Sequence, residues 1–302
     1  MKKVPVLVLA FNRADHVAKA MTSIREYRPE RLYLECDGPR VHKQGEAKAV
    51  EETRKTMLEA VDWPCEIKTL FREENLGCAN AVNDAITWFF KHEEYGVICE
   101  DDIVFSLDFF KLSEELLPRY IKEDRIMCIN SQNPSKRTDI PNTYVYGYRS
   151  SCWGWATWRR AWAKMDMSMS AVPNLKYSFL FKRLGVFEGL ITMKYFKTGY
   201  KRLPYYNSWA NRWYLSILAN NGLTITPGVN LSKNIGIDGG AHFETGDIDP
   251  YADLLIGNIQ WPLIYNDSFV IDSQQSRYDE KDFFRWRMIG LKKKIRRLFL
   301  NR

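Results

Sequence analysis

The sequence lacks the cysteine and histidine patterns that identify zinc-binding or disulfide-rich proteins. Among its 302 residues are only four histidines, and the six cysteines lie far apart without a C-x-x-C pair. Structural zinc sites and disulfide frameworks both depend on recurring cysteine spacings. The pattern therefore favours reduced thiols in the core of a cytoplasmic protein.

Long apolar runs are also missing. A helix needs about 20 apolar residues to cross a bilayer, and no segment of this sequence approaches that length. The N-terminal apolar stretch from Val4 to Phe11 follows two lysines but turns polar at Asn12. It is too short and too quickly polar for a signal peptide. We therefore expect a chain that does not span a membrane.

A third absence is the glycine-rich phosphate loop, since neither a P-loop nor a G-x-G-x-x-G motif occurs. The net charge of +7 nevertheless favours an anionic partner, such as a phosphate-bearing ligand, nucleic acid or an acidic membrane surface. Without a glycine cradle, a nucleotide diphosphate is most simply held through a divalent cation.

The first hundred residues alternate between short apolar runs and longer amphipathic ones. The pattern predicts strands at residues 4–10, 31–36, 67–71 and 97–99, and helices at 14–27, 44–61 and 78–90. This order predicts an α/β fold of the Rossmann-like kind, with a mostly parallel sheet and helices on both faces. Ligands of such sheets bind beyond the carboxyl ends of the strands.

Three polar clusters fall at those strand ends: Asn12-Arg13, Asp37-Gly38-Pro39 and Glu100-Asp101-Asp102. The acidic triplet has a plain alternative as a solvated turn, in which Asp102 or Ser106 caps the next helix. Carboxylate oxygens, however, suit Mg²⁺ or Mn²⁺. Because no glycine loop is present, we expect the triplet to face a ligand.

Four segments carry a resemblance to a known family. They are V-L-V-L-A-F-N-R, C-D-G-P, E-N-L-G-C-A-N-A-V-N-D-A and C-E-D-D-I-V-F-S-L-D-F-F. Together they resemble the nucleotide-sugar domain of GT-A glycosyltransferases, over about residues 4 to 245. Within that group the sequence is similar to the bacterial hemolysin-like branch of family 2 and to the N-acetylglucosaminyltransferase I type.

The resemblance implies a donor site, position by position. Arg13 would hold the donor, Asp37 would read the uracil edge, and Glu100 and Asp101 would face the sugar and the ribose. Asp102 would bind the metal that bridges the diphosphate. The remaining implied donor residues are Phe11, Asn12, Arg72, Asn75, Gly77 and Asn80. For Gly77 a simple turn, and for Arg72 a solvated charge, stay open as alternatives.

A late glycine-rich loop contains His242, between Gly236, Gly239, Gly240 and Glu244. A lone histidine is more often a surface or core residue than a ligand. The resemblance implies that His242 reaches the metal or the diphosphate, on a loop that closes over the donor.

Residues 1–127 would form the donor half, residues 128–250 the acceptor half of the same domain, and residues 251–302 a C-terminal extension. Trp155, Trp158 and Trp162 recur at helical spacing, which predicts a core helix capped near Ser150 or Ser151. Acceptor contacts are expected from Trp153, Trp155 and Trp209, because sugars bind against aromatic faces.

In the resembling families an acidic residue after the tryptophan of the helix expected at 209–221 acts as the general base. Here that position is Ala210, which cannot accept a proton. Three explanations are open. The base lies elsewhere, with Glu244, Asp238 and Asp247 as candidates; the chain is a natural binder that has lost turnover; or Ala210 replaces an aspartate by engineering. The intact surroundings favour the third.

The C-terminal extension ends in a basic amphipathic pattern. Phe284, Met288, Leu291, Ile295 and Leu298 share one helical face. Eight basic residues accompany them: Arg285, Arg287, Lys292, Lys293, Lys294, Arg296, Arg297 and Arg302. This indicates a helix at residues 283–302 that lies on an anionic membrane surface, or one that packs on the domain or a second subunit.

The sequence thus predicts a metal-dependent, inverting glycosyltransferase at the inner face of the plasma membrane. It would use Mn²⁺ or Mg²⁺ to transfer a sugar from a UDP-sugar, with UDP-N-acetylglucosamine first to test, to a glycan acceptor that can be lipid-linked, in bacterial surface polysaccharide synthesis. The alternatives are a nucleotidyltransferase, or a non-catalytic protein that binds nucleotide-sugars or anionic surfaces. No nucleic-acid partner is expected, because the acidic triplet would repel a phosphate backbone.

Overall fold

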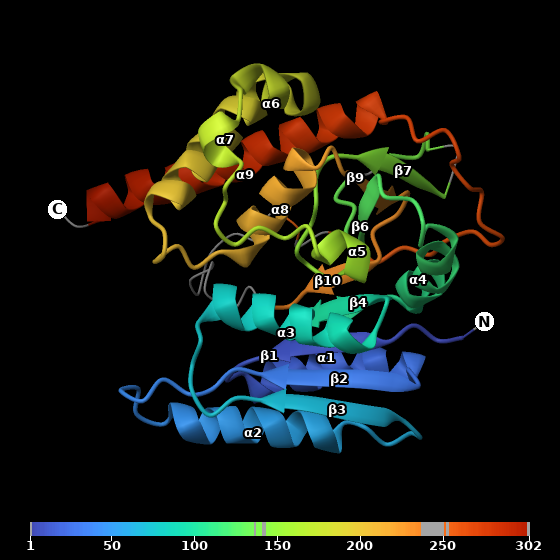
Figure 1. Ribbon diagram of the computed structural model, residues 1–302, viewed down its shortest axis with the longest axis vertical. Helices are drawn as coiled ribbons and strands as arrows, with labels where there is room; N and C mark the ends of the chain where they lie inside the picture. The colour runs from blue at the N-terminus through green and yellow to red at the C-terminus, as the bar shows by residue number, and fades with distance from the viewer. Residues whose placement is uncertain (1, 136, 141–142, 237–250, 252–253, 301–302) are drawn as a thin grey trace.

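The computed structural model describes residues 2–135, 137–140, 143–236, 251 and 254–300 (Figure 1). Side chains are described as far as Arg285, and beyond it at Met288. The predictions for Glu244, His242, Asp238 and Asp247 concern residues outside these ranges. No helix in the described part of the chain is long and apolar enough to cross a membrane.

A sheet of eight strands forms the centre, in the order β3-β2-β1-β4-β8-β6-β9-β7. The strands are β1 (Val6–Ala10), β2 (Arg31–Cys36), β3 (Glu66–Phe71), β4 (Tyr95–Glu100), β6 (Ile126–Asn130), β7 (Tyr144–Gly147), β8 (Trp155–Trp158) and β9 (Leu223–Pro227). Strands β1 to β4 are parallel, β6 and β9 are parallel to each other, and β8 and β7 run against their neighbours. The predicted mostly parallel α/β sheet is confirmed.

Helices lie on both faces of this sheet, as expected. Helix α1 (Ala14–Tyr27) contacts α2 (Glu46–Glu59) and α4 (Leu107–Arg119), whereas α3 (Cys78–His92) contacts α5 (Arg159–Trp162) and α8 (Trp209–Ala219). Helix α1 forms because Val17, Met21 and Ile24 recur at intervals of four and three residues and bury one side of it. Each helix therefore covers part of the sheet with such an apolar stripe.

The helix expected from Trp155, Trp158 and Trp162 is wrong. Residues 155–158 form strand β8, and only the short helix α5 follows it. Successive strand residues point to opposite faces of a sheet, so Trp155 and Trp158 lie on opposite sides. Trp158 donates from Nε1 to the Leu117 carbonyl on α4, while Trp155 packs on Trp209 of α8. A strand that is buried on both faces can carry the same tryptophan spacing as a core helix.

A small second sheet pairs β5 (Ile103–Phe105) with β10 (Ser232–Asn234) in antiparallel orientation. Strand β5 follows the acidic triplet directly, and β10 comes from more than a hundred residues further along the chain. This pairing brings residues 232–236 next to the triplet.

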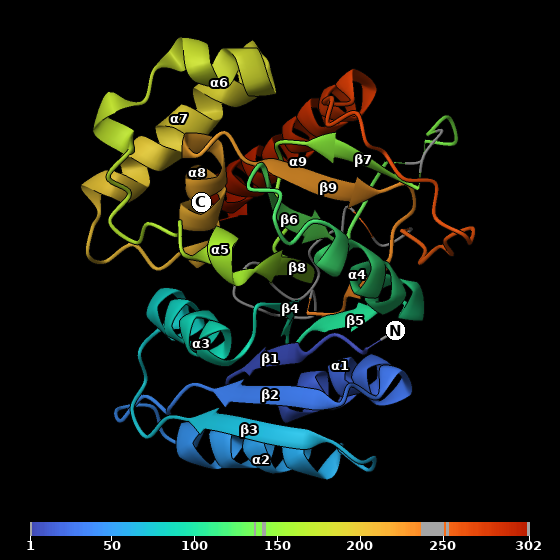
Figure 2. The same cartoon turned by 45° about the vertical axis from the view of Figure 1, so that its right-hand side comes forward.

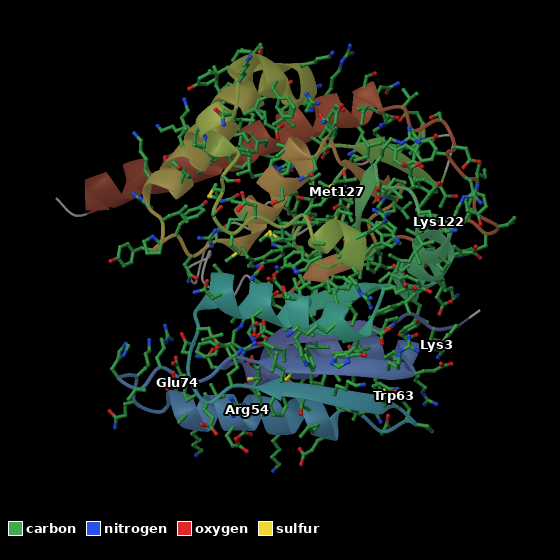
Figure 3. All side chains as sticks on the ribbon, viewed as in Figure 1. Lys3, Arg54, Trp63, Glu74, Lys122 and Met127 are labelled. Atoms are coloured by element: carbon green, nitrogen blue, oxygen red, sulfur yellow. The ribbon has the colours of Figure 1, made fainter. Side chains whose placement is uncertain are left out.

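The C-terminal elements gather at the end of the molecule opposite β3 (Figure 2). Short helix η1 (Val172–Asn174) precedes α6 (Tyr177–Leu184) and α7 (Val186–Lys201), which form a hairpin, and α9 (Ser273–Leu300) packs along α7. The predicted C-terminal helix is therefore present and begins earlier than expected. The main apolar core spans the large sheet and includes Trp63 as well as Met127 (Figure 3), whereas a second, smaller core lies between α6, α7 and α8.

Candidate functional site

The acidic triplet lies where β4 ends. Glu100 is the last residue of β4, and Asp101 and Asp102 form the turn into β5. Because β1 and β2 run parallel to β4, their carboxyl ends bring Arg13 and Asp37 to the same edge of the sheet. The fold thus gathers the three polar clusters that the sequence analysis singled out.

Arg13 binds the triplet directly. Its Nε donates to Oδ2 of Asp101 at 3.1 Å, and its Nη2 donates to Oδ1 of Asp101 and to Oδ2 of Asp102, the latter at 3.0 Å. A guanidinium is always charged and presents several donors in one plane. Arg13 therefore partly neutralises the carboxylates and fixes their orientation.

Burial makes Glu100 and Asp101 costly to ionise. It raises the pKa of Glu100 to about 8, helped by the charges of Asp102 and Asp101, although Arg13 and a hydrogen bond with the Trp209 side chain act in the opposite direction. Burial also raises the pKa of Asp101 to about 6, against the pull of Arg13. Among the described residues Arg13 is the one ion-pair partner of these carboxylates, so the site favours a cationic or cation-bearing ligand.

Asp102 provides an oxygen for such a cation. Its Oδ1 is buried and has no hydrogen-bond partner among the described residues. The chain after β10 covers the same residue: the Ile235 N–H donates to the Asp102 carbonyl at 2.8 Å, and a Cβ placed on Gly236 would lie 2.2 Å from Oδ2 of Asp102. An orphaned hard oxygen beneath a glycine fits Mg²⁺ or Mn²⁺.

The protein does not form a complete metal cage by itself in the described ranges. There, no three His, Cys, Asp or Glu side chains lie together in a way that could hold a metal ion. A cation at Asp102 would need further oxygens from a ligand, as Mg²⁺ commonly takes from phosphates.

Asp37 holds together the loop next to it, and its expected contact with the uracil edge stays a prediction. Its carboxylate accepts hydrogen bonds from the backbone N–H groups of Gly38, Leu76 and Gly77, and from the Asn75 side chain, at 2.9 to 3.2 Å. Asp37 is buried. It therefore ties the loop before α3 to the end of β2, and both its oxygens are engaged in doing so.

Other implied donor residues also have partners within the fold. Asn12 donates to Oε1 of Glu46 at 3.1 Å, Arg72 pairs with Asp84 and lies 3.5 Å from Glu35, and Asn80 donates to the Leu76 carbonyl at 3.3 Å. The Phe11 ring lies 5.5 Å from the Arg40 guanidinium. Gly77 has φ +77°, which only glycine adopts freely, so the turn alternative for Gly77 accounts for it.

The start of α8 borders the triplet. Ser208 caps the helix, the Asn207 side chain accepts the Ala79 N–H of α3 at 2.8 Å, and the Trp209 side chain bonds to Glu100. Ala210 follows in the first turn and is half-buried. The position at which the resemblance implies a base is therefore next to the site, but it carries a methyl group.

Two of the three tryptophans expected to contact an acceptor are core residues. Trp155 is 1% exposed and Trp209 is 3% exposed, and their rings stack at 5.8 Å. Their position inside the sheet–α8 interface leaves no face for a sugar. Trp153 differs, because it is half-buried and lines a pocket.

This pocket has a volume of about 400 Å³ and draws on six parts of the chain. It is lined by Asn130 of β6, Gln132 and Pro134, Arg149 to Trp153, Tyr195 of α7, Thr226 of β9, Tyr251, and Gln275, Asp279, Asp282 and Phe283 of α9. Of these, only Trp153 was predicted from the sequence as a site residue. No local signal could have found the others, because the residues that meet here lie as much as 150 positions apart.

A half-buried arginine, Arg149, organises the polar part of the pocket. Arg149 donates to the Asp279 carbonyl at 2.6 Å and lies 3.7 Å from the Asp282 carboxylate. Burial raises the pKa of Asp279 to about 6 despite Arg149. The pocket therefore combines carboxylates with aromatic rings, which suits a hydroxyl-rich ligand rather than a phosphate.

Cys152 links the pocket to the triplet. Burial raises the pKa of this thiol, and the next cause is the charge of Glu100, followed further down by that of Asp102. Next to Cys152, the Trp153 carbonyl accepts a hydrogen bond from Ser232 Oγ at 3.3 Å. Ser232 belongs to β10, which pairs with β5 directly after the triplet, so this wall of the pocket lies close to the triplet. The two sites are neighbours along one edge of the sheet.

Comparisons with known proteins leave the family open. The sequence matches no family model and no curated protein. Solved structures that resemble it include HddC from Yersinia pseudotuberculosis, at 10% identity over 52% of this chain and 77% of that one, with a TM-score of 0.31. The inositol-1-phosphate CTP transferase from T. maritima matches at 12% identity over 54% and 74%, with a TM-score of 0.31.

The glycosyltransferase GlyE of Streptococcus pneumoniae TIGR4 matches at 11% identity over 58% of this chain and 41% of that chain, with a TM-score of 0.31. These neighbours thus include a nucleotidyl-type transferase and a glycosyltransferase. Likenesses at this level carry no argument about activity, and the narrower resemblance to the hemolysin-like branch stays a prediction.

Proposed function

We propose that this protein is a metal-dependent transferase that binds a nucleotide-sugar at Arg13 and the triplet and a sugar acceptor in the pocket beside Trp153. The observation that carries the proposal is the buried, unpartnered Oδ1 of Asp102. Leaving a buried carboxylate oxygen without a partner costs about 1 to 3 kcal/mol or more. A diphosphate-bound cation would supply that partner.

The residues around Asp102 would divide the work. A cation held by Asp102 would stabilise the negative charge that develops on a leaving diphosphate. Arg13 orients the Asp101 and Asp102 carboxylates, and Glu100 lies at the same strand end. The raised pKa of Glu100 means that a cation bound nearby would favour release of the Glu100 proton.

The pocket supports an acceptor role because of its chemistry and its place. Asp279, Asp282, Gln132 and Asn130 offer oxygens and amides to hydroxyl groups, and Trp153 offers an aromatic ring. Its wall at Trp153 is bonded to β10, which pairs with the strand that follows the triplet. Residues that accept hydroxyl hydrogen bonds and hold a sugar against a ring would place an acceptor beside the donor.

Turnover requires a base, and Ala210 stands where the resemblance implies one. We propose an inverting mechanism in which an aspartate at this position would complete the site, with Glu244 as the alternative base. UDP-N-acetylglucosamine is the first donor to test, and a bacterial surface polysaccharide is the proposed product. If Ala210→Asp gives no gain in sugar transfer to a confirmed acceptor, this part of the proposal is wrong.

Calorimetric titration tests the donor site. UDP and UDP-sugars are titrated with and without Mn²⁺ into the unchanged protein, into Asp102→Asn, and into Asp124→Asn as a matched control at an exposed carboxylate. We expect Mn²⁺-dependent binding whose affinity falls at least about 100-fold in Asp102→Asn, because the charged carboxylate that would hold the cation is lost. The affinity should be unchanged in the control. Absence of nucleotide binding both with and without Mn²⁺ would overturn the proposal.

The same protein also tests the nucleotidyltransferase alternative. Such an enzyme would consume a nucleoside triphosphate and a sugar phosphate and release pyrophosphate. The residues after β1, Phe11-Asn12-Arg13-Ala14-Asp15, do not form the glycine-rich basic loop that holds a triphosphate. If the protein releases pyrophosphate from these substrates, it is a nucleotidyltransferase and the glycosyltransferase proposal is wrong.

A further inference from the structure

Helix α7 has an inverted distribution of apolar and polar residues. On its outer side Val186 is 60% exposed, Leu190 is 48% exposed and Phe187 is 40% exposed. The side that packs against the protein instead contains Glu188, Gly189, Thr192 and Gly199, together with Met193 and Phe196. An ordinary surface helix buries its apolar residues and exposes its polar ones.

Such an exposed apolar face indicates an interaction surface. The face continues beyond α7. Tyr177 of α6 and Tyr200 of α7 are also exposed, and Tyr205, just after α7, is almost fully exposed. Among the residues that the structure describes, nothing covers this face.

The charges on this hairpin are almost all positive. Between positions 176 and 202 the basic residues are Lys176, Lys182, Arg183, Lys194, Lys197, Lys201 and Arg202, and all but the half-buried Arg183 are exposed. The only acidic residue in that range is Glu188, which is buried. Lys194, Lys197 and Lys201 recur at intervals of three and four, so they lie on the same side of α7 as Val186 and Leu190.

Helix α9 extends the surface. The rings of Phe187 and Phe284 pack at 5.1 Å, and Met288 is exposed one turn further along. Figures 1 and 2 show α9 running beside α7 and past it towards the C-terminus. From Arg285 onward the sequence has eight basic residues and no acidic one.

We propose that the outer face of α7, together with the second half of α9, docks on an anionic phospholipid bilayer. The apolar side chains would enter the interface, and the flanking lysines would bind lipid phosphates. A second copy of this chain is the less suitable occupant, because a two-fold contact would bring one basic face against another. Val186, Leu190 and Phe187 are too few to offset that repulsion.

This docking has a consequence for the pocket. Tyr195 of α7 and Phe283 of α9 line the pocket, and they belong to the two helices that form the docking face. Tyr195 is on a different side of α7 from Leu190, so an acceptor carried on a membrane lipid would pass the edge of the docking face to enter the pocket. This last step rests on the proposed function, whereas membrane docking itself does not.

Co-sedimentation with vesicles tests the docking. Vesicles of phosphatidylcholine alone and of phosphatidylcholine with phosphatidylglycerol are mixed with the full chain at low and high salt. We expect binding to the anionic vesicles only, weakened at high salt. Replacing Lys194, Lys197 and Lys201 by glutamine should lower the partition coefficient about 100-fold, because each lysine near the surface contributes about fivefold.

A matched variant replaces Lys19, Lys48 and Lys91, which are exposed on the donor half, by glutamine. It changes the net charge equally and should alter partition less than about twofold. Leu190→Ser should weaken binding about tenfold at both salt concentrations, because the apolar contribution is not screened. Equal losses in the two lysine variants, or full binding after the α7 changes, would overturn the proposal.

Two further outcomes would also overturn it. One is concentration-dependent dimerisation in sedimentation velocity that Leu190→Ser abolishes, since α7 would then face a second copy. The other is equal binding to neutral and anionic vesicles. The nucleotide titration described above is independent of all these results, so failure of docking and failure of the proposed donor site can be told apart.

Discussion

At the scale of single residues, Asp37 shows how a strand-end carboxylate can be occupied by the fold. It accepts three backbone N–H groups and one side-chain amide from residues 38 and 75–77. Asp37→Ala would leave these donors without an acceptor and should lower the free energy of unfolding by about 3 kcal/mol. Urea denaturation measures this. Asp37→Asn keeps one acceptor oxygen and should lose less.

Asp62→Ala is the matched control, because Asp62 is exposed and pairs only with Arg25 among the contacts described for it. Its effect should stay within about 0.5 kcal/mol. A protein with Asp37→Ala that keeps full stability but loses UDP binding would show instead that Asp37 reads the nucleotide.

Gly236 allows a second prediction at this scale. A methyl group at this position would lie 2.2 Å from Oδ2 of Asp102, so Gly236→Ala must displace either the chain after β10 or the carboxylate. We expect Mn²⁺-dependent UDP binding to weaken at least about tenfold in calorimetric titration, as overpacking costs about 1 to 3 kcal/mol. Gly147→Ala is the control, because its added Cβ would meet Thr224 at an ordinary 3.7 Å. Equal affinities in the two variants would contradict the close contact.

The sequence identified the residues of the triplet and of Arg13, because their signal is local: each follows an apolar strand directly. It could not reveal that Arg13 binds Asp101 and Asp102, since these residues are 88 and 89 positions apart. Nor could it find Arg149, whose partners, the Asp279 carbonyl and the Asp282 carboxylate, come from α9. Long-range pairs of this kind arise only from the way the strands and helices pack.

At the scale of elements, β8 shows that the spacing of apolar residues does not always distinguish a strand from a helix. Trp155 and Trp158 fit a helix by spacing, but β4 and β6 pair with this segment on either side and make it a strand. Short apolar runs that are buried on both faces do not distinguish the two structures. The longer amphipathic helices α1 and α3, by contrast, were predicted to within two residues of their observed ends.

The contact of α7 with α9 makes stability depend on pH. Glu188 lies on the buried side of α7, and burial raises its pKa to about 7; the charged groups around it are Arg149, Asp279, Glu280 and Asp282. The folded protein therefore holds a proton that the unfolded chain releases near pH 4.5. The stability from this group is complete below pH 4.5 and is lost as pH rises through 7, by about 3 kcal/mol.

Urea denaturation between pH 4.5 and 7.5 checks this effect, with Glu188→Gln as the variant and Glu94→Gln, at an exposed position, as the control. The glutamine at position 188 should reduce the downward slope of stability with pH, and part of the slope should remain because Asp279 titrates near pH 6. An unchanged slope in Glu188→Gln would mean that Glu188 stays ionised beneath α7.

At the scale of the whole molecule, the two halves share one sheet. The boundary expected after residue 127 falls within β6, and β8 joins β4 of the first half to β6 of the second. A single apolar cluster also extends from β2 and Trp63 to β9. Disrupting either half exposes the apolar face of the other, so we expect both to unfold together.

Native-state hydrogen exchange followed by mass spectrometry can test this cooperativity. As urea is raised, amides in β2 and amides in β9 should converge on one free energy of opening. Trp155→Ala, which opens a cavity in the joining strand, should lower that value in both strands equally, by about 3 to 5 kcal/mol. If β1 to β3 instead opened at a lower free energy than β6 and β9, the donor half would be a separate folding unit. The triplet and the pocket would then be held together only through strand β8. Loosening β8 would separate the donor site from the acceptor site.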